Sequence, residues 1–350
     1  MSGPARSYAT VRVPATTANL GAGFDCIGMA VDKGLTVSVE LRAGSKETVS
    51  LGRSGTLREL DLGGLSDVGE DLIWQGFRAV QRGRGGRDGI RGSIRFEASS
   101  DVPIARGLGS SAAALLAGAA LANAALGLLL SLDDLAQICS RIEGHGDNVG
   151  AAAYGGAVLV SPRAGGSYFA PLPVHESLGF AFAVPEFETR TELARAALPG
   201  EVAFATAVNA AARSASLVRG LQTADRQLLA AGLDDVLHVP HRKALVPHYE
   251  RVAQAARAAG AFGATLSGSG SSMVAIAPRG VAAQVAAAMA RAWCTAGVGA
   301  RGFATGVCHE GLTANSTRIT ANSRQTTANS RPQTTDLRPQ TSGETKCQLQ

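Results

Sequence analysis

The segment Pro103–Ala113, with the sequence P-I-A-R-G-L-G-S-S-A-A, combines residue types that bind phosphate. Gly107 and Gly109 permit backbone conformations and close approaches that a Cβ atom would block. Ser110 and Ser111 stand at the expected start of a helix, where unpaired N–H groups and the helix dipole attract anions. A serine hydroxyl there can also ligate Mg²⁺. The segment indicates a phosphate site or, more simply, a glycine turn with a serine helix cap.

A second polar segment, P-A-T-T-A-N-L-G-A-G-F-D, spans residues 14–25. Asn19 offers an amide donor and acceptor, Asp25 offers a carboxylate, and Gly21 and Gly23 allow sharp turns between them. An amide with a carboxylate can hold an ammonium group and a hydroxyl. The same residues also form ordinary turns, so this segment alone does not decide between a loop and a binding site.

A third segment, E-G-H-G-D-N, follows an expected helix at residues 132–143 and precedes an apolar stretch. Glu143 is a candidate metal ligand. His145, Asp147 and Asn148 either hold a substrate or cap a helix. Because the flanking residues are apolar and expected to be buried, convergence of these polar groups on a site gains weight.

Two arginines in distinctive segments, Arg195 and Arg242, are candidates for binding a carboxylate, although a solvated arginine is the simpler interpretation of each. The stretch S-G-S-G-S-S at residues 267–272 indicates close backbone packing against a ligand or a tight turn. The histidines at positions 238, 241 and 248 have no neighbouring carboxylate that would complete a metal site.

Several function classes are excluded by what the chain lacks. None of its four lysines lies near residues 103–113, so a P-loop of the form G-x-x-x-x-G-K-[ST] is absent, and so is a Rossmann G-x-G-x-x-G at this segment. The net charge of +5 includes +3 from residues 313–350, which leaves a nearly neutral body. Such a body carries no broad electrostatic footprint for nucleic acid.

The elements expected around these segments mix strands and helices without a strict βαβ repeat, which predicts an α+β protein of two lobes. Strands are expected at residues 8–13, 36–41, 94–97, 157–161, 178–185 and 273–277, and helices at residues 72–82, 132–143, 201–220, 247–259 and 281–296. The boundary between lobes is placed at residues 161–166. The nearly uncharged stretch 112–130 is rich in Ala and Gly and follows a glycine turn, so we interpret it as a buried helix rather than a membrane span.

The C-terminal residues differ in kind from the rest. T-A-N-S recurs at Thr313, Thr320 and Thr327, and 21 of the 38 residues from Thr313 onward are Ser, Thr, Asn or Gln. The sequence predicts a low-complexity, disordered tail over residues 310–350. Five scattered cysteines and an N-terminus without an apolar segment favour a reducing, cytoplasmic location with no membrane partner.

Taken together and in this order, the segments P-A-T-T-A-N-L-G-A-G-F-D, P-I-A-R-G-L-G-S-S-A-A, E-G-H-G-D-N and G-A-T-L-S-G-S-G-S-S resemble the motifs of the GHMP kinases. The first and third segments resemble in particular those of the homoserine kinase family. The resemblance covers residues 11–301 and excludes the tail. It implies an N-terminal ATP-binding lobe (1–163), a C-terminal lobe (164–309) and an active site between them.

The resemblance also implies a reaction and its participants. ATP would pass its γ-phosphoryl group to the side-chain hydroxyl of L-homoserine, with Mg²⁺ held by Ser111 and Glu143. Homoserine would lie among Asn19, Asp25, His145, Asn148, Arg195 and Arg242. Asn148, Asp147 and Arg195 are the candidate catalytic residues. The ATP phosphates would contact Pro103, Ile104, Ala105, Arg106, Gly107, Leu108, Gly109, Ser110, Ser111, Ala112 and Ala113.

Some features of the resemblance leave alternatives open. Mevalonate-type relatives carry an Asp base where Asn148 stands, so no dedicated carboxylate base is expected here, although Asp147 is adjacent. Ser271, Gly146 and Asp71 depart from common family residues, and Asp71 bears on nucleotide preference. Another GHMP small-molecule kinase, acting on mevalonate or a sugar, and a non-catalytic nucleotide-binding regulator remain alternatives. A homodimer is left open.

Overall fold

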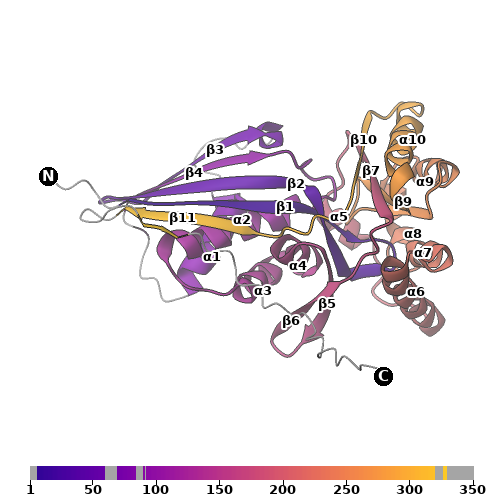
Figure 1. Cartoon of the computed structure of the whole chain (residues 1–350), viewed down its shortest axis with the longest axis horizontal. Coiled ribbons are helices and arrows are strands. Elements are labelled where there is room, and N and C mark those ends of the chain that lie inside the picture. Colours follow the sequence, from indigo (N-terminus) through magenta and orange to yellow (C-terminus); the bar gives the residue numbers. More distant parts are fainter. Residues whose placement is uncertain (1–5, 60–68, 84–89, 91, 320–325, 329–350) are drawn as a thin grey trace, which may run out of the picture.

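A computed structural model describes residues 6–59, 69–83, 90, 92–319 and 326–328, and it forms two lobes side by side (Figure 1). The first lobe contains a mixed sheet in the order β12-β11-β1-β2-β4-β3, with β5 and β6 added beside β2. Only β3 and β4 run parallel among these pairs. Its strands are β1 (Arg6–Asn19), β2 (Gly23–Ala43), β3 (Thr48–Gly55), β4 (Gly92–Ser100), β5 (Ala157–Arg163), β6 (Gly166–Leu172), β11 (Thr313–Ile319) and β12 (Thr326–Ala328).

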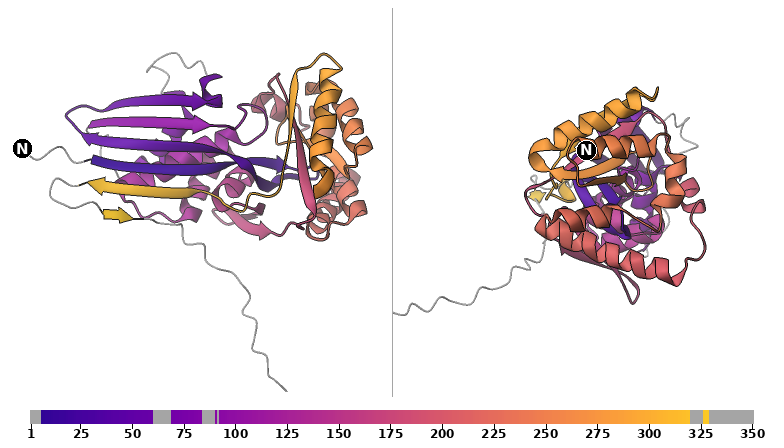
Figure 2. Two further views of the ribbon diagram at one scale, coloured as in Figure 1. Left: turned by 45° about the horizontal axis from the view of Figure 1, so that its top comes forward. Right: turned by 90° about the vertical axis from the view of Figure 1, so that its right-hand side faces the viewer.

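Helices cover one face of this sheet, as Figure 2 shows. The strands alternate accordingly: in β4, Ile94 and Phe96 are buried, whereas Arg95 and Glu97 are exposed. Helix α2 is buried along most of its length, and its small alanine side chains let it pack closely against the sheet. The helices are α1 (Leu72–Gly83), α2 (Ser110–Leu126), α3 (Leu132–Glu143) and α4 (Asp147–Tyr154).

The second lobe is built on an antiparallel sheet in the order β10-β7-β9-β8. Its core surrounds the fully buried Trp293, whose indole nitrogen donates a hydrogen bond to Pro247 O at 2.8 Å. Its strands are β7 (Leu178–Pro185), β8 (Gly263–Leu266), β9 (Met273–Pro278) and β10 (Ala300–Thr305). Its helices are α5 (Thr191–Ala196), α6 (Phe204–Thr223), α7 (Arg226–Leu233), α8 (Val239–Arg242), α9 (Tyr249–Ala258) and α10 (Ala282–Cys294).

The end of the β1–β2 hairpin joins the two lobes. Leu20, Ile27 and Met29 are fully buried in one apolar cluster with Phe180 and Phe182 of β7. Burial of such side chains contributes roughly 1.5–3 kcal/mol each. The N-terminal hairpin therefore belongs to both cores, and the space between the lobes is framed by a shared apolar base.

Several expected elements are confirmed, and two expectations were wrong. The helix at 132–143 and the strand at 178–185 have the predicted bounds. Residues 14–19, expected as part of a loop, instead continue β1, with register shifts at Pro14/Ala15 and Ala18/Asn19 that bend the strand toward the second lobe. The predicted boundary at residues 163–164 falls inside the β5–β6 hairpin, because β6 pairs with β5 of the first sheet.

The first part of the predicted disordered tail is an ordered strand. Thr313–Ile319 forms β11, which pairs antiparallel with β1 from Arg6↔Ile319 to Arg12↔Thr313 (Figure 1). Leu312 is buried in the core of the first lobe just before this strand. Residues 326–328 form β12; the rest of the predicted tail lies outside the described residues. In the part of the chain that the structure describes, no helix is long and apolar enough to cross a membrane.

Candidate active site

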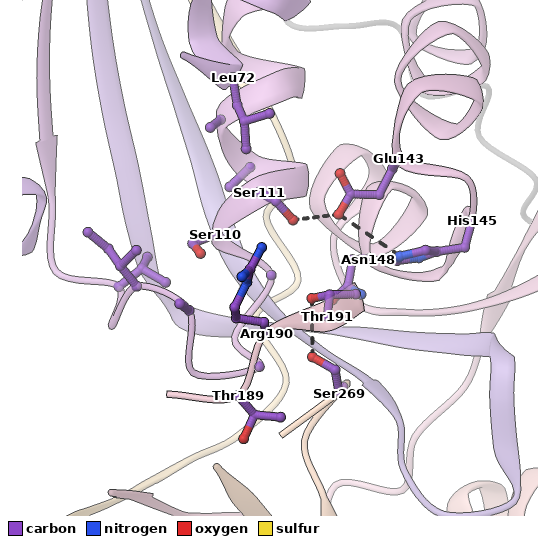
Figure 3. A pocket seen from close by; sticks show the side chains of 18 of the residues that line it. Leu72, Ser110, Ser111, Glu143, His145, Asn148, Thr189, Arg190, Thr191 and Ser269 are labelled. Carbon is purple, nitrogen blue, oxygen red and sulfur yellow. Dashed lines mark hydrogen bonds and ion pairs between the residues drawn. The ribbon is translucent and has the colours of Figure 1, made fainter. Parts of the chain in front are cut away.

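A cavity of about 410 Å³ lies between the lobes, and side chains from both line it (Figure 3). The first lobe contributes the start of α2 and the end of α3 with the start of α4. The second lobe contributes α5 and its preceding residues, α8 and the loop before β9. The cavity therefore brings together residues from all four sequence segments that carry the family resemblance.

The glycine-rich loop before α2 is locked between the two lobes. Gly107 and Gly109 have φ values of +72° and +67°, which favour glycine. A Cβ at Gly109 would lie 1.8 Å from Thr16 Oγ1, and one at Gly107 would lie 2.1 Å from Ser267 O. No side chain caps α2, so its first N–H groups remain available to an anion in the cavity.

Two oxygen-bearing side chains meet beside this helix start. Ser111 Oγ donates a hydrogen bond to Glu143 Oε1, and His145 Nε2 lies 4.0 Å from the same carboxylate oxygen (Figure 3). Glu143 is the last residue of α3, and Gly144 follows with φ +86°, which ends that helix at the cavity. A hydroxyl and a carboxylate are hard oxygen donors of the kind that Mg²⁺ prefers.

The residues after Glu143 form a hydrogen-bonded network in the first lobe. Asp147 Oδ1 accepts hydrogen bonds from His145 Nδ1 at 2.5 Å and from Asn148 N at 2.7 Å. Asn148 Oδ1 accepts one from Thr16 Oγ1 at 2.7 Å. Burial lowers the pKa of His145, but the hydrogen bond and charge of Asp147, with the charge of Glu143, outweigh it and raise the pKa above its ordinary value.

Next to this network, where the two lobes meet, the cavity carries a paired charge. Arg195 of α5 donates two parallel hydrogen bonds to Asp25, at 3.0 and 2.9 Å. Asp25 is held from behind because its backbone N–H donates to Asn19 Oδ1, while Asn19 Nδ2 donates to Gly268 O. The hydrogen bond to Asp25 raises the pKa of Arg195, so this guanidinium is charged at any working pH.

Arg242 lines the same side but is only 2% exposed. Its Nε donates to Ala194 O at 3.0 Å, and its guanidinium lies 4.9 Å from the centre of the Phe24 ring. Burial, and then the charge of Arg195, lower the pKa of Arg242. Arg242 thus holds the helix that carries Arg195, a supporting role that the sequence did not indicate.

A buried histidine packs against Phe24 and Arg242. His238 is fully buried, stacks on Phe24 with ring centres 4.9 Å apart, and donates from Nε2 to Gly21 O at 3.0 Å. Burial lowers its pKa to about 4, so the ring is neutral at pH 7 and its Nδ1 can accept a hydrogen bond from Arg242.

Four of the eleven residues predicted to contact phosphate do not line the cavity: Pro103, Arg106, Leu108 and Ala112. Leu108 and Ala112 are fully buried in the cores. The Arg106 guanidinium points away, donating to Pro185 O at 3.0 Å and Glu186 O at 2.6 Å and pairing with Glu188 at 2.8 Å. In this structure Arg106 ties the loop to the residues that lead into α5, and its contact with phosphate stays a prediction.

The other predicted site residues surround the cavity together with residues that the sequence analysis did not single out. Thr16, which donates to Asn148 from beneath the cavity lining, belongs to the segment P-A-T-T-A-N-L-G-A-G-F-D. Nothing in the sequence distinguishes it, since any threonine in a strand can form a hydrogen bond. No motif includes the lining residues Thr189, Arg190, Thr191 and Glu192. The signal they carry in the sequence is a charged stretch just before Arg195. Arg53 lies 18 residues from its partner Asp71, and no spacing rule joins the two.

The far end of the cavity is mainly apolar, with Leu35, Leu57, Leu72, Val102 and Ile104 in its lining. Asp71 caps α1 by accepting from Ile73 N at 2.8 Å, and it pairs with Arg53 at 2.5 Å. An apolar slot edged by such a donor–acceptor pair suits a heterocyclic base.

Asp25, His145 and Asp147 place ligand atoms within 4.8 Å of one another, the one cluster of this kind among the described residues. Asp25 already binds Arg195, and Asp147 already binds His145. A cation that entered this recess would therefore compete with Arg195 for Asp25.

Comparisons with known proteins agree with this geometry. The family model of the GHMP kinases N terminal domain matches residues 71–156, and that of the GHMP kinases C terminal matches residues 217–295. The fold and site therefore define a GHMP kinase, an ATP-dependent phosphotransferase.

Similar whole chains narrow the class. A homoserine kinase of Trichormus variabilis is 40% identical over 292 residues, which cover 83% of this chain and 94% of the relative. One of Gloeobacter violaceus is 38% identical, covering 81% and 92%. The crystal structure of homoserine kinase from Cytophaga hutchinsonii matches with a TM-score of 0.77 at 30% identity, covering 88% of this chain and 97% of that one. The chain belongs to the homoserine kinase family, which confirms the resemblance seen in the motifs.

Proposed function

We propose that this protein transfers the γ-phosphoryl group of ATP to the side-chain hydroxyl of L-homoserine, making O-phospho-L-homoserine for threonine biosynthesis in the cytoplasm. The observation that carries the proposal is a single cavity with two unlike walls. One wall has the uncapped α2 start beside Ser111 and Glu143, and the adjoining wall, where the lobes meet, has the Asp25–Arg195 pair. The first suits a metal-bound polyphosphate and the second suits a zwitterionic amino acid.

ATP is assigned to the first lobe. Its base would occupy the apolar slot near Leu57 and Leu72, and its phosphates would meet the N–H groups at the start of α2. Ser111 and Glu143 would hold Mg²⁺, which when bound neutralises phosphate charge. The residues fit that ion, because both offer hard oxygens and already lie within hydrogen-bond distance of each other.

Homoserine is assigned to the adjoining wall. Its α-carboxylate would bind the Arg195 guanidinium, and its α-ammonium would bind Asp25 in the recess shared with His145 and Asp147. The amino acid would thus replace the internal Asp25–Arg195 pair with two pairs of its own. Since that pair is more than one-third exposed, separating it costs little.

In the transfer step, the homoserine hydroxyl oxygen forms a bond to the γ-phosphorus while the bond from that phosphorus to the β–γ bridging oxygen breaks. ADP leaves with the electron pair, and the hydroxyl proton passes to a phosphoryl oxygen and then to water. Asp147 Oδ1 already accepts from His145 and Asn148, which suits a positioning residue better than a base. An Asp147→Asn variant that binds both substrates and is fully inactive would contradict this role.

A coupled assay of ADP release tests the proposal. Purified protein with Mg-ATP is given L-homoserine, mevalonate, galactose or L-threonine in separate reactions, and the phosphorylated product is identified by mass. We expect turnover with homoserine. Turnover with another substrate alone would keep the kinase class and reject the substrate, and ATP binding without any turnover would favour a regulatory protein.

A further inference from the structure

Among the described residues, the first lobe offers no free cationic side chain to the phosphate end of the cavity. Within the described lining residues there is no lysine, and the guanidinium of Arg106 is bound to Pro185 and Glu186. Arg53 pairs with Asp71 at the far end. Phosphoryl transfer spreads negative charge over three oxygens of the moving group, so a free positive side chain nearby would stabilise its transition state.

Arg190 is placed to be that cation. Its side chain points into the cavity toward the start of α2, where Ser110 and Ser111 lie (Figure 3). The side chain is 74% exposed, and its recorded partner is Glu192 at 3.7 Å, beyond hydrogen-bond distance. By contrast, the guanidinium groups of Arg195 and Arg242 both donate hydrogen bonds within the protein.

The backbone around Arg190 is held by its neighbours, whereas its side chain is exposed. Thr189 is buried, and Thr191 Oγ1 lies 3.4 Å from Ser269 Oγ. Arg190 N-caps α5 without a side-chain bond, and its C=O accepts from Ala194 N at 3.1 Å. Its pairing with the exposed Glu192 is screened by solvent and easily exchanged for a phosphate.

We propose that Arg190 is a catalytic residue that contacts the γ-phosphoryl group of ATP during its transfer, supplied by the second lobe. The proposal rests on the proposed function. The guanidinium donates to non-bridging γ-oxygens while the acceptor hydroxyl oxygen bonds to phosphorus and ADP departs with the electron pair of the broken bond. Arg190 takes no proton, and its planar fork matches two phosphoryl oxygens.

Substitution at Arg190 tests this by separating kcat from KM. Arg190→Met keeps the length and removes the charge; we expect kcat to fall about 100-fold, while KM for homoserine changes less than about threefold. Arg190→Lys keeps the charge and should recover part of the loss. Arg226→Met, an exposed arginine outside the cavity, is the matched control and should behave as wild type.

Calorimetric binding of nucleotides gives a readout that does not depend on turnover. Arg190→Met should weaken binding of the non-hydrolysable analogue AMP-PNP and leave ADP binding unchanged, because only the former has a γ-phosphate. Unchanged kcat and unchanged AMP-PNP binding would overturn the proposal, as would a raised KM for homoserine at unchanged kcat. If the wild type fails to phosphorylate homoserine, the proposed substrate is wrong, but the AMP-PNP comparison still decides the role of Arg190.

Discussion

The two walls of the cavity are held in place by different means. In the first lobe, Glu143, His145, Asp147 and Asn148 are bonded to one another or to a neighbour, and Asp147 is only 1% exposed. In the second lobe, Arg195 lies on the six-residue helix α5, and its side chain is 39% exposed. The first wall is continuous with a core, whereas the second presents Arg195 from a short helix, with the buried Arg242 behind it.

Substitutions in the first wall should therefore affect both activity and stability, whereas substitutions on α5 should affect activity alone. A polar group lost from the buried wall leaves its partners without hydrogen bonds, which costs about 1–3 kcal/mol in addition to any loss of activity. An exposed ion pair contributes little to folding, so a charge lost from α5 should affect ligand binding alone.

The largest effect is expected at the Ser111–Glu143 pair. Ser111→Ala or Glu143→Gln should lower kcat/KM at least about 1000-fold and raise the Mg²⁺ concentration needed for half-maximal rate, because each removes an oxygen ligand. The measurement is the steady-state rate across a Mg²⁺ series. Ser216→Ala, on α6 and outside the cavity, is the matched control; equal losses in both serine variants would contradict the assignment.

A smaller loss, confined to substrate binding, is expected at Arg195. Arg195→Ala should raise KM for homoserine about 100-fold through loss of a bidentate carboxylate contact, with a lesser change in kcat. The free energy of unfolding should stay within about 0.5 kcal/mol of wild type. Steady-state kinetics and urea unfolding measure the two quantities. A fall in stability with an unchanged KM would reverse the contrast between the walls.

Thr16 sharpens the contrast from the buried side. Thr16→Val keeps the shape of this fully buried residue but removes the 2.7 Å bond to Asn148. We expect kcat to fall about tenfold and the free energy of unfolding to fall by about 1 kcal/mol, because the half-buried Asn148 Oδ1 loses its hydrogen bond within the protein. Thr10→Val, elsewhere in β1, serves as control for both assays. A variant with wild-type stability would show that this wall is not coupled to the core.

The sequence predicted the parts of the site whose chemistry follows from residue type. Glycines before a helix with Ser110 and Ser111 predicted an anion site at the start of α2, and E-G-H-G-D-N predicted a convergent polar cluster. The structure places the start of α2 and this cluster beside the cavity; anion binding there stays a prediction. The motif places Arg106 in the loop but says nothing about where its long side chain turns. Its carbonyl partners at residues 185 and 186 lie 79 and 80 residues away.

The missed features depend on contacts between distant segments or on the backbone. β11 has the polar composition of a tail, yet its edge pairing with β1 uses N–H and C=O groups that every residue carries. Pro14–Asn19 has turn-like residues but continues β1 because β2 lies beside it. Arg190 carries no motif, so only the cavity indicates a role for it.

His238 is expected to affect stability alone. It tests whether Arg195 and Arg242 rest on a support that is buried and uncharged. Its folded-state pKa of about 4 lies below the ordinary value of about 6.5 for the unfolded chain. Between these values the unfolded state binds more protons, so the free energy of unfolding falls as the pH falls from about 6.5 toward 4. Asp235, Arg242 and Asp25 are the charged groups that face this ring.

The test compares wild type with His238→Gln by urea unfolding at pH 7.5, 6 and 5. The wild type should lose on the order of 2 kcal/mol more than the variant between pH 7.5 and 5, because glutamine takes up no proton. His175→Gln, an exposed histidine, should follow the wild type. An equal loss of unfolding free energy with falling pH in wild type and His238→Gln would mean that the ring can be charged in the folded state. The contact of Arg242 with His238 would then tolerate a charge, as the exposed Asp25–Arg195 pair does.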